Sequence, residues 1–546
     1  MIKKINSIIR MLCVVCFLLS GGFAATSLAK ELKPVPEIDF LTWIPAKFMI
    51  YSETSNYIAE EWEKIGLKVN VRPESFPNPL LTQWFKTHKF DCVISVLSGL
   101  PYRMEPDFFT NSQFNSKHAA PGNWNVGEWK NGAFDKIGEK QLEIYDPEKR
   151  RELIYEIQTL MKKEQPETVV NYPIENMGIN TKNMDLEYAD APDGLRSIWN
   201  QIRFEPKEGV KFLKVGRISD QATWNPLAAI QSDDFEMLRM VYDRLVQVGP
   251  KGEIEMWAAK TITSIDQVTV DVELKQDLAF SDGKPLTAED VKFTYDFMKK
   301  WEAAYFLKYL KPIKNIEVVS NYKLRFNLEK PFAPFIMNTL GQVFIIPKHV
   351  WENVVTENGL SKPQDYSSTP VVGSGPFIME YWKEAEEFML KANRKHFTQP
   401  KSDLLFIVFG TRELVNASLK KGMIDINIQS LPPAVVKEFK NDKNLRLFEV
   451  KTNGYTAVRY NTAKPAFSHV ALRQACSFAV PYQKIIDEIN DGFAGLSSSS
   501  ITPVNSFWHN KNLAPPEYNL EKARQILKNA GFQWDKNGRL CFPDEK

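Results

Sequence analysis

The chain has 546 residues, 43% of them hydrophobic, which is enough to bury a large core and predicts more than one lobe. The 69 basic and 67 acidic residues leave a net charge of +2, and neither sign forms a long run. This composition excludes a disordered or fibrous chain, and it gives no sign of nucleic acid or an anionic membrane as a partner.

The first 29 residues have the three-part pattern of a secretory signal peptide. A positively charged start is followed by an apolar run from Met11 to Leu19, too short to span a bilayer, and by the small-residue cleavage site Ser27-Leu28-Ala29. Cys16 lies in the apolar run without the small residue that precedes a lipidated cysteine. The sequence therefore predicts export to the periplasm with cleavage near Ala29.

Helical and strand patterns alternate after this segment. Residues 57–65 carry apolar side chains at helical spacing and end at Gly66, and the alternating residues 67–71 predict a strand directly afterwards. Asp146 and Pro147 predict the cap and the first position of the next clear helix.

The second half of the chain continues this alternation. The polar stretch 205–209, broken by Pro and Gly, predicts a linker. Period-two patterns predict strands over 269–274 and 323–328, and Thr287 with the acidic residues after it predicts a helix start. The serines 497–500 are expected to form an irregular surface connection. Together these elements predict a mixed α/β fold.

The cysteines and histidines predict a protein that folds without metal or cofactor. Cys92, Cys476 and Cys541 are the cysteines that follow the signal segment, and they are scattered. At most one disulfide could form among them, and buried free thiols are the alternative. The six His show no paired ligand spacing.

A series of motifs from Lys211 onward resembles the extracellular solute-binding proteins of family 5, the peptide and nickel receptor group. The motifs stand in the family's own order, at 224–227 (WNPL), 241–246 (VYDRLV), 280–291 (FSDGKPLTAEDV), 328–335 (LEKPFAPF), 346–351 (IPKHVW), 372–377 (VGSGPF), 421–425 (KGMID) and 518–523 (YNLEKA).

The segment that resembles the family's final third stands at the front of the chain. Its motifs lie at 38–41, 60–71, 134–136 and 146–150. The resemblance therefore implies a circular permutation in which residues 205–210 join the old ends. The new break would fall between a turn at 535–538 and the polar, Pro-containing stretch 33–36.

The resemblance implies a two-lobe clamp of the periplasmic-binding-protein type. The expected divisions are 1–29 for the signal peptide, 171–430 for the first lobe, and 30–170 with 431–546 for the second lobe. The implied function is that of the substrate-binding component of an ABC importer, a monomer that encloses a peptide or similar solute and delivers it to a membrane permease.

An oligosaccharide receptor of the same fold is the alternative function, and a secreted enzyme is a weaker one. Gly373-Ser374-Gly375 is not a nucleophile elbow, and the sequence contains no phosphate-binding GxxxxGK[ST] loop. We therefore expect a binding protein rather than an enzyme.

The resemblance also implies candidate ligand-binding residues. Peptide-binding relatives carry an Asp that clamps the peptide amino group, where this chain has Tyr102 in the stretch 98–106, and Glu105 is a substitute for that Asp. Tryptophans near this stretch offer faces for stacking on a sugar or an extended peptide. The full candidate set is Tyr102, Glu105, Asn123, Trp124, Trp129, Asn225, Ser374 and Trp508.

Overall fold

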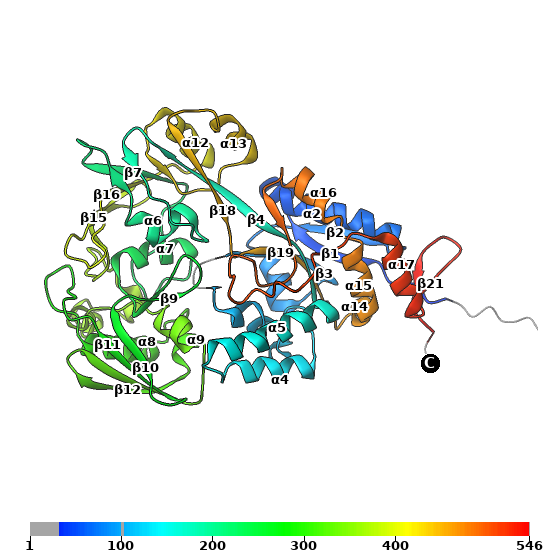
Figure 1. Ribbon diagram of the computed structural model, residues 1–546, viewed down its shortest axis with the longest axis horizontal. Helices are drawn as coiled ribbons and strands as arrows, with labels where there is room; N and C mark the ends of the chain where they lie inside the picture. Colours follow the sequence, from blue (N-terminus) through cyan, green and yellow to red (C-terminus); the bar gives the residue numbers. More distant parts are fainter. Residues whose placement is uncertain (1–31, 100–102, 545–546) are drawn as a thin grey trace, which may run out of the picture.

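Two bodies, each with its own apolar core, make up the computed structural model of residues 32–99 and 103–544 (Figure 1). The core of the first lobe uses residues between Met177 and Val450. The main core of the second lobe uses residues 35–170 together with 458–540. The predicted two-lobe α/β fold is confirmed, and the predicted signal peptide lies outside the described residues.

One large sheet runs through both lobes. Its order is β14-β15-β16-β7-β17-β4-β19-β3-β1-β2, with β18 and β20 also paired to β4. The bounds are β14 (Phe377–Lys383), β15 (Glu387–Ala392), β16 (Asp403–Val408), β7 (Phe212–Arg217), β17 (Ile426–Asn427), β4 (Glu167–Asn180), β19 (Tyr455–Tyr460), β3 (Cys92–Leu97), β1 (Ile38–Trp43), β2 (Val69–Glu74), β18 (Leu445–Lys451) and β20 (Ala494–Leu496).

The first lobe adds a second sheet with the order β10-β11-β13-β12 and several small elements. The strands are β10 (Ala259–Ser264), β11 (Thr269–Leu274), β12 (Ile313–Ser320), β13 (Lys323–Leu328), and the pairs β5 (Met184–Asp185) with β6 (Glu205–Pro206) and β8 (Val246–Val248) with β9 (Ile254–Met256). The helices are α6 (Ile198–Gln201), α7 (Ser232–Val241), α8 (Ala288–Lys300), α9 (Leu307–Leu310), η6 (Phe335–Leu340), α10 (Lys348–Trp351), α11 (Val354–Glu357), α12 (Arg412–Lys421) and α13 (Pro433–Phe439).

The second lobe takes its elements from both halves of the chain. Its helices are α2 (Pro45–Lys64), η1 (Thr82–Thr87), α3 (Asn111–Phe114), α4 (Gly132–Gln141), α5 (Pro147–Glu164), α14 (Pro465–Ser468), α15 (Val470–Phe478), α16 (Tyr482–Lys484), η8 (Ile485–Ile489) and α17 (Leu520–Asn529). In the described part of the chain, none of the helices is long and apolar enough to cross a bilayer.

Local signals account for several helix ends. The Asp146 carboxylate accepts hydrogen bonds from the backbone N–H groups of Glu148 and Lys149 at the start of α5, as predicted. Thr287 and Asp290 form the reciprocal capping box of α8. Gly66 follows α2 with a φ of +97°, and a Cβ there would lie 2.7 Å from the Trp534 ring, so glycine is required for the close approach.

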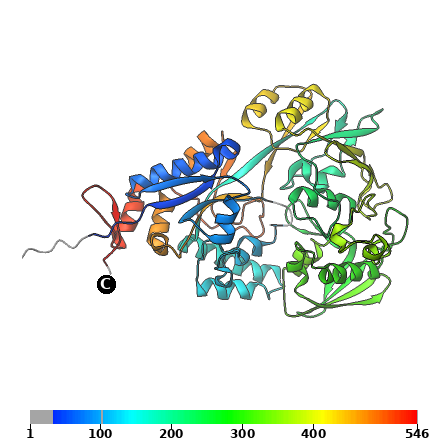
Figure 2. The ribbon, with the colours of Figure 1, turned by 180° about the vertical axis from the view of Figure 1, so that it is seen from behind.

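Segments from the two halves of the chain also pair at the end of the second lobe that faces away from the first (Figure 2). β21 (Gln533–Trp534) and β22 (Leu540–Cys541) form a hairpin, and the backbone of Cys541 forms an isolated antiparallel β-bridge with Pro34. The Val35 N–H donates to the Leu540 carbonyl (2.9 Å). In the part of the chain that the structure describes, Cys92, Cys476 and Cys541 are buried free thiols, so none of them forms the disulfide that the sequence allowed.

Candidate ligand-binding cleft between the lobes

Two antiparallel connections carry the chain between the lobes. The first residues of β4 pair with β19 in the second lobe, and its last residues, from Ile174 onward, pair with β18. Phe448 and Val450 of β18 belong to the core of the first lobe. The structure thus places residues 431–450 beside the first lobe, although the sequence analysis assigned them to the second lobe. The second connection between the lobes lies at Lys451–Gly454.

A cavity of about 440 Å³ lies at these crossings. Its volume falls within the range of pockets for small ligands, roughly 300–1,000 Å³. Both lobes and both crossing strands line it, with Tyr172, Pro173, Ile174, Asp190, Ala191, Pro192, Pro250, Lys251, Lys451, Thr452, Gly495, Leu496, Thr502, Pro503 and Val504.

The charged groups of this cavity are Asp190 and Lys251 from the first lobe and Lys451 from the end of β18. All three side chains are exposed, and in the described part of the chain none of them forms an ion pair with another residue. A carboxylate and two ammonium groups on an otherwise largely apolar wall fit a solute that carries both signs of charge.

A short loop of the second lobe reaches into the first lobe next to the cavity. The side chain of Met104 is fully buried between Val248 and Met337 of the first lobe. The amide of Asn505 donates to the Met104 carbonyl (2.6 Å), and the amide of Asn453 donates to the Arg103 carbonyl (3.1 Å). The buried side-chain amides of Asn453 and Asn505 therefore hold the backbone of this loop in place.

The lobes also touch at a second place, beside α4. The Ala333 N–H donates to the Leu142 carbonyl (2.6 Å), and the Phe332 N–H donates to the Tyr145 hydroxyl (3.0 Å). With the Met104 contact, these bonds describe lobes that are closed upon each other.

The predicted residues Glu105 and Trp508 are brought together, but they do not line the cavity. The buried carboxylate of Glu105 forms an ion pair with Arg150 and accepts a hydrogen bond from the Asp107 N–H (3.2 Å). The Arg150 guanidinium lies 5.1 Å from the Trp508 ring centroid. Because the Glu105 carboxylate is already bonded to these partners, Glu105 has a structural role in supporting the loop.

The predicted residues at 123–129 lie in the second lobe with different exposure. Trp129 is buried and packs edge-on against Phe134, with ring centroids 5.0 Å apart. Trp124 is 42% exposed and contacts Phe108, whose ring carries the Arg103 guanidinium at 4.8 Å. Asn123 is exposed beside it. Trp124 thus keeps part of its ring exposed, although it does not line the cavity, whereas Trp129 serves the core.

The other predicted residues lie elsewhere. Asn225 is fully buried in the first lobe, where its amide donates to the carbonyls of Pro363 and Tyr366. Ser374 is buried and accepts a hydrogen bond from the Asp243 N–H (3.4 Å). Both positions are occupied by internal bonds. Tyr102 lies outside the described residues.

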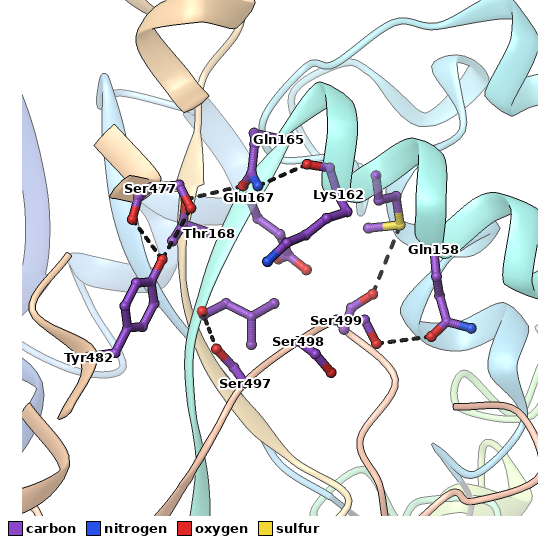
Figure 3. A pocket seen from close by; sticks show the side chains of 13 residues that line it. Gln158, Lys162, Gln165, Glu167, Thr168, Ser477, Tyr482, Ser497, Ser498 and Ser499 are labelled. Atoms are coloured by element: carbon purple, nitrogen blue, oxygen red, sulfur yellow. Dashed lines mark hydrogen bonds between the residues drawn. The ribbon is translucent and has the colours of Figure 1, made fainter. Parts of the chain in front are cut away.

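A smaller cavity of about 30 Å³ lies inside the second lobe between α5, the start of β4 and the serines 497–500 (Figure 3). It has room for one or two water molecules and not for a peptide. Ser497, Ser499 and Ser500 are buried, and the Ser499 hydroxyl donates to the Gln158 side chain (2.9 Å). The expectation of a surface connection here is wrong, because these hydroxyl groups bond to β4 and α5.

The fold and the cavity define a two-lobe α/β protein with space for a small solute between its lobes. Residues 253–543 match the family model described as bacterial extracellular solute-binding proteins, family 5 Middle. This match covers more than half of the chain, and the chain therefore belongs to that family.

The chain is 28% identical over 345 residues to the oligopeptide-binding protein AppA of Bacillus subtilis, covering 61% of this chain and 61% of that protein. It is 26% identical over 316 residues to the dipeptide-binding protein of Escherichia coli, covering 54% of this chain and 58% of that protein. A solved structure of Bacillus subtilis AppA with a nonapeptide aligns at 25% identity and a TM-score of 0.46, covering 61% of this chain and 66% of that one. The chain spans about three-fifths of the length of these curated relatives.

Proposed function

We propose that this protein is the substrate-binding component of an ABC importer and that it captures a peptide or a similar zwitterionic solute. The observation that carries the proposal is the cavity of about 440 Å³ whose walls come from both lobes and bear both signs of charge. Asp190 would accept hydrogen bonds from an α-amino group, and Lys251 or Lys451 would bind a carboxylate.

In this proposal, closure of the lobes is driven by the ligand. A solute that touches both lobes has a higher affinity for the closed state and shifts the population toward it. The Met104 contact and the hydrogen bonds at Leu142 and Tyr145 add protein contacts that only the closed state makes. A permease in the inner membrane would then recognise the closed form. The mature protein would act as a periplasmic monomer after cleavage near Ala29, without turnover of its ligand.

We also propose the circularly permuted order of the chain. A linear sequence comparison follows one order of segments only, so an alignment would stop where that order changes. The motifs that stand in the family's own order lie in residues 211–546. The coverage of 61% of this chain supports this proposal. It is also supported by the pairing of residues 33–35 with 539–542 and by the short connection at 205–210, where Glu205–Pro206 pairs with Met184–Asp185.

Calorimetry with a peptide panel tests the proposed function. We expect a tripeptide with a free α-amino group to bind the mature protein, and Asp190→Asn to weaken this binding roughly tenfold or more, because a hydrogen bond to a charged group is worth about 1.5–3 kcal/mol. Asp185→Asn is the matched control, since Asp185 is an exposed carboxylate of the first lobe outside the cavity. N-acetylation of the peptide should have no further effect on the Asp190→Asn variant.

Two results would contradict this function. Equal binding of the free and N-acetylated peptides would show that the amino group is not recognised. Binding of an oligosaccharide instead of any peptide would favour the alternative receptor, with the exposed face of Trp124 as the first stacking residue to replace. Mass spectrometry of the solute that copurifies with the mature protein would identify the ligand directly.

A further inference from the structure

The small cavity inside the second lobe contains a cation without a counter-charge. Lys162 of α5 is partly buried, and its side chain points into this cavity (Figure 3). In the part of the chain that the structure describes, the Lys162 ammonium group forms no ion pair and donates no hydrogen bond. Burial lowers the pKa of Lys162, because the charged form is poorly solvated there.

The carboxylate in the cavity wall, that of Glu167, is already neutralised. It forms an ion pair with Arg459 (3.0 Å) and accepts a hydrogen bond from the Tyr455 hydroxyl (2.9 Å). The charges of Glu167 and Arg459 therefore cancel, and Lys162 leaves the cavity with a net positive charge. A buried cation is unfavourable unless an anion or other acceptors lie beside it.

Hydroxyl groups line the same space, and two of them are free to donate. The Ser497 hydroxyl donates to the Val169 carbonyl (2.6 Å), and others are bonded in the same way to protein acceptors. The Ser498 hydroxyl, by contrast, has no partner in the described residues. The Ser500 hydroxyl makes only a long contact of 3.9 Å with the Met161 sulfur. An occupant of the cavity thus meets one ammonium and two hydroxyl donors.

We propose that this cavity binds a chloride ion between the Lys162 ammonium and the hydroxyl groups of Ser498 and Ser500. The net charge of the cavity requires an anion, and the free groups are donors, which match a species that only accepts hydrogen bonds. A volume of about 30 Å³ holds a single ion close in size to a water molecule and excludes a larger organic anion.

The chloride ion fixes a segment that also borders the large cavity between the lobes. The serines 497–500 line the small cavity, whereas Leu496 and residues 502–504 line the large one. The Ser499 hydroxyl already ties this segment to the Gln158 side chain of α5 (2.9 Å). The ion adds a charged link between α5 and the segment, so its binding stiffens one wall of the ligand cavity.

Thermal unfolding in sodium chloride and in sodium gluconate at equal ionic strength tests the site, because gluconate is too large for the cavity. We expect about 0.5 M chloride to raise the melting temperature of the mature protein by roughly 2–4 °C over gluconate, as a ligand of the native state does. Lys162→Met should abolish this difference. In gluconate, the variant should be at least as stable as the wild type, since it removes a cation without a counter-charge.

Lys163→Met is the matched control, because Lys163 is the next residue of α5 and its side chain is exposed. Its carbonyl accepts a hydrogen bond from the Gln474 amide (2.7 Å), which the substitution leaves in place. This variant should keep the full chloride-dependent difference of the wild type. The same difference in all three proteins would show a general effect of salt and would overturn the site.

Bromide locates the ion, since it occupies chloride sites and scatters X-rays anomalously. Crystals of the mature protein soaked in sodium bromide should show an anomalous peak in the cavity beside Lys162, and crystals of Lys162→Met should lack it. Water alone in the cavity would overturn the proposal. A bromide peak without a chloride-dependent melting temperature would also overturn it, because the peak would then mark an adventitious ion only.

Hydrogen exchange tests the link to the large cavity, and like the other two measurements it needs no peptide, so it is independent of the proposed function. Chloride should slow the exchange of amides in residues 497–504 several-fold in the wild type and in Lys163→Met, but not in Lys162→Met. Exchange in this segment that does not respond to chloride in the wild type would overturn the stiffening of the wall.

Discussion

The two lobes use the chain in different ways. The core of the first lobe comes from one continuous stretch between Met177 and Val450, whereas the second lobe joins residues that are hundreds of positions apart. The Trp62 indole, for example, donates to the Cys476 carbonyl (3.0 Å) across a separation of 414 residues. The second lobe therefore depends more strongly on single long-range bonds, and paired substitutions in the two lobes test this difference.

The largest effect is expected from Arg459→Met in the second lobe. Arg459 and Glu167 form a buried pair (3.0 Å) that also holds the Tyr455 hydroxyl, and burial raises the pKa of Glu167. Removal of the guanidinium leaves the carboxylate buried without a counter-charge, which costs about 3–5 kcal/mol of the free energy of unfolding. Urea unfolding gives the loss, and hydrogen exchange should locate it in β19.

Arg325→Met in the first lobe is the matched control for this change. Arg325 pairs with Asp271 of the second sheet, and 38% of the arginine side chain is exposed, whereas Asp271 is buried and also pairs with Lys323 (3.2 Å). Because the arginine is exposed and Lys323 still neutralises Asp271 after the substitution, the loss should be about 1 kcal/mol or less. The double substitution Arg459→Met with Glu167→Gln should recover part of the stability. Equal losses for the two arginine variants would refute the contrast between the lobes.

A smaller difference in stability between the lobes is expected when a buried tryptophan is replaced by phenylalanine in each of them. Trp62→Phe removes the indole donor and leaves the Cys476 carbonyl with the Ala479 N–H alone (3.2 Å), at a cost of about 0.5–1.5 kcal/mol beyond the change in packing. Trp224 of the first lobe is equally buried, but its indole N–H has no hydrogen-bond partner in the described structure. Trp224→Phe should therefore destabilise less. Thermal unfolding of both variants measures the difference, and a larger loss for Trp224→Phe would contradict it.

The smallest effect is expected from an insertion at Gly209, where the permuted order would join the old ends. Gly209 has a φ of +83°, and nothing lies within 4 Å of the position of a Cβ. Four added Gly/Ser residues should change the free energy of unfolding by less than about 1 kcal/mol, since loop closure costs about 0.6 kcal/mol per doubling of length.

The same insertion after Gly66 is the control, because that turn packs against Trp534 and Gly538. We expect a clear loss of thermal stability there. Collapse of the fold after insertion at Gly209 would count against the proposed permutation.

The candidate site shows where sequence reasoning stopped. The stretch around Glu105 was expected to contact ligand, and the structure places it beside the cleft, but Glu105 itself is paired with Arg150. Asp190, Lys251 and Lys451 were missed, although Lys251 follows Pro250 and Asp190 stands two residues before Pro192, and both prolines indicate loops. Charged residues in loops are common in any exported protein, so no signal in the sequence separates these three from the rest.

The sequence by itself determined the local elements. The strands Thr269–Leu274 and Lys323–Leu328 and the helix starts at Asp146 and Thr287 follow from side-chain alternation and capping, which act within a few residues. The tertiary structure alone decided which charges meet in the cavity and that Asn225, Ser374 and Trp129 are buried. These properties depend on the distance between segments far apart in the chain, and that distance is set by how both lobes pack.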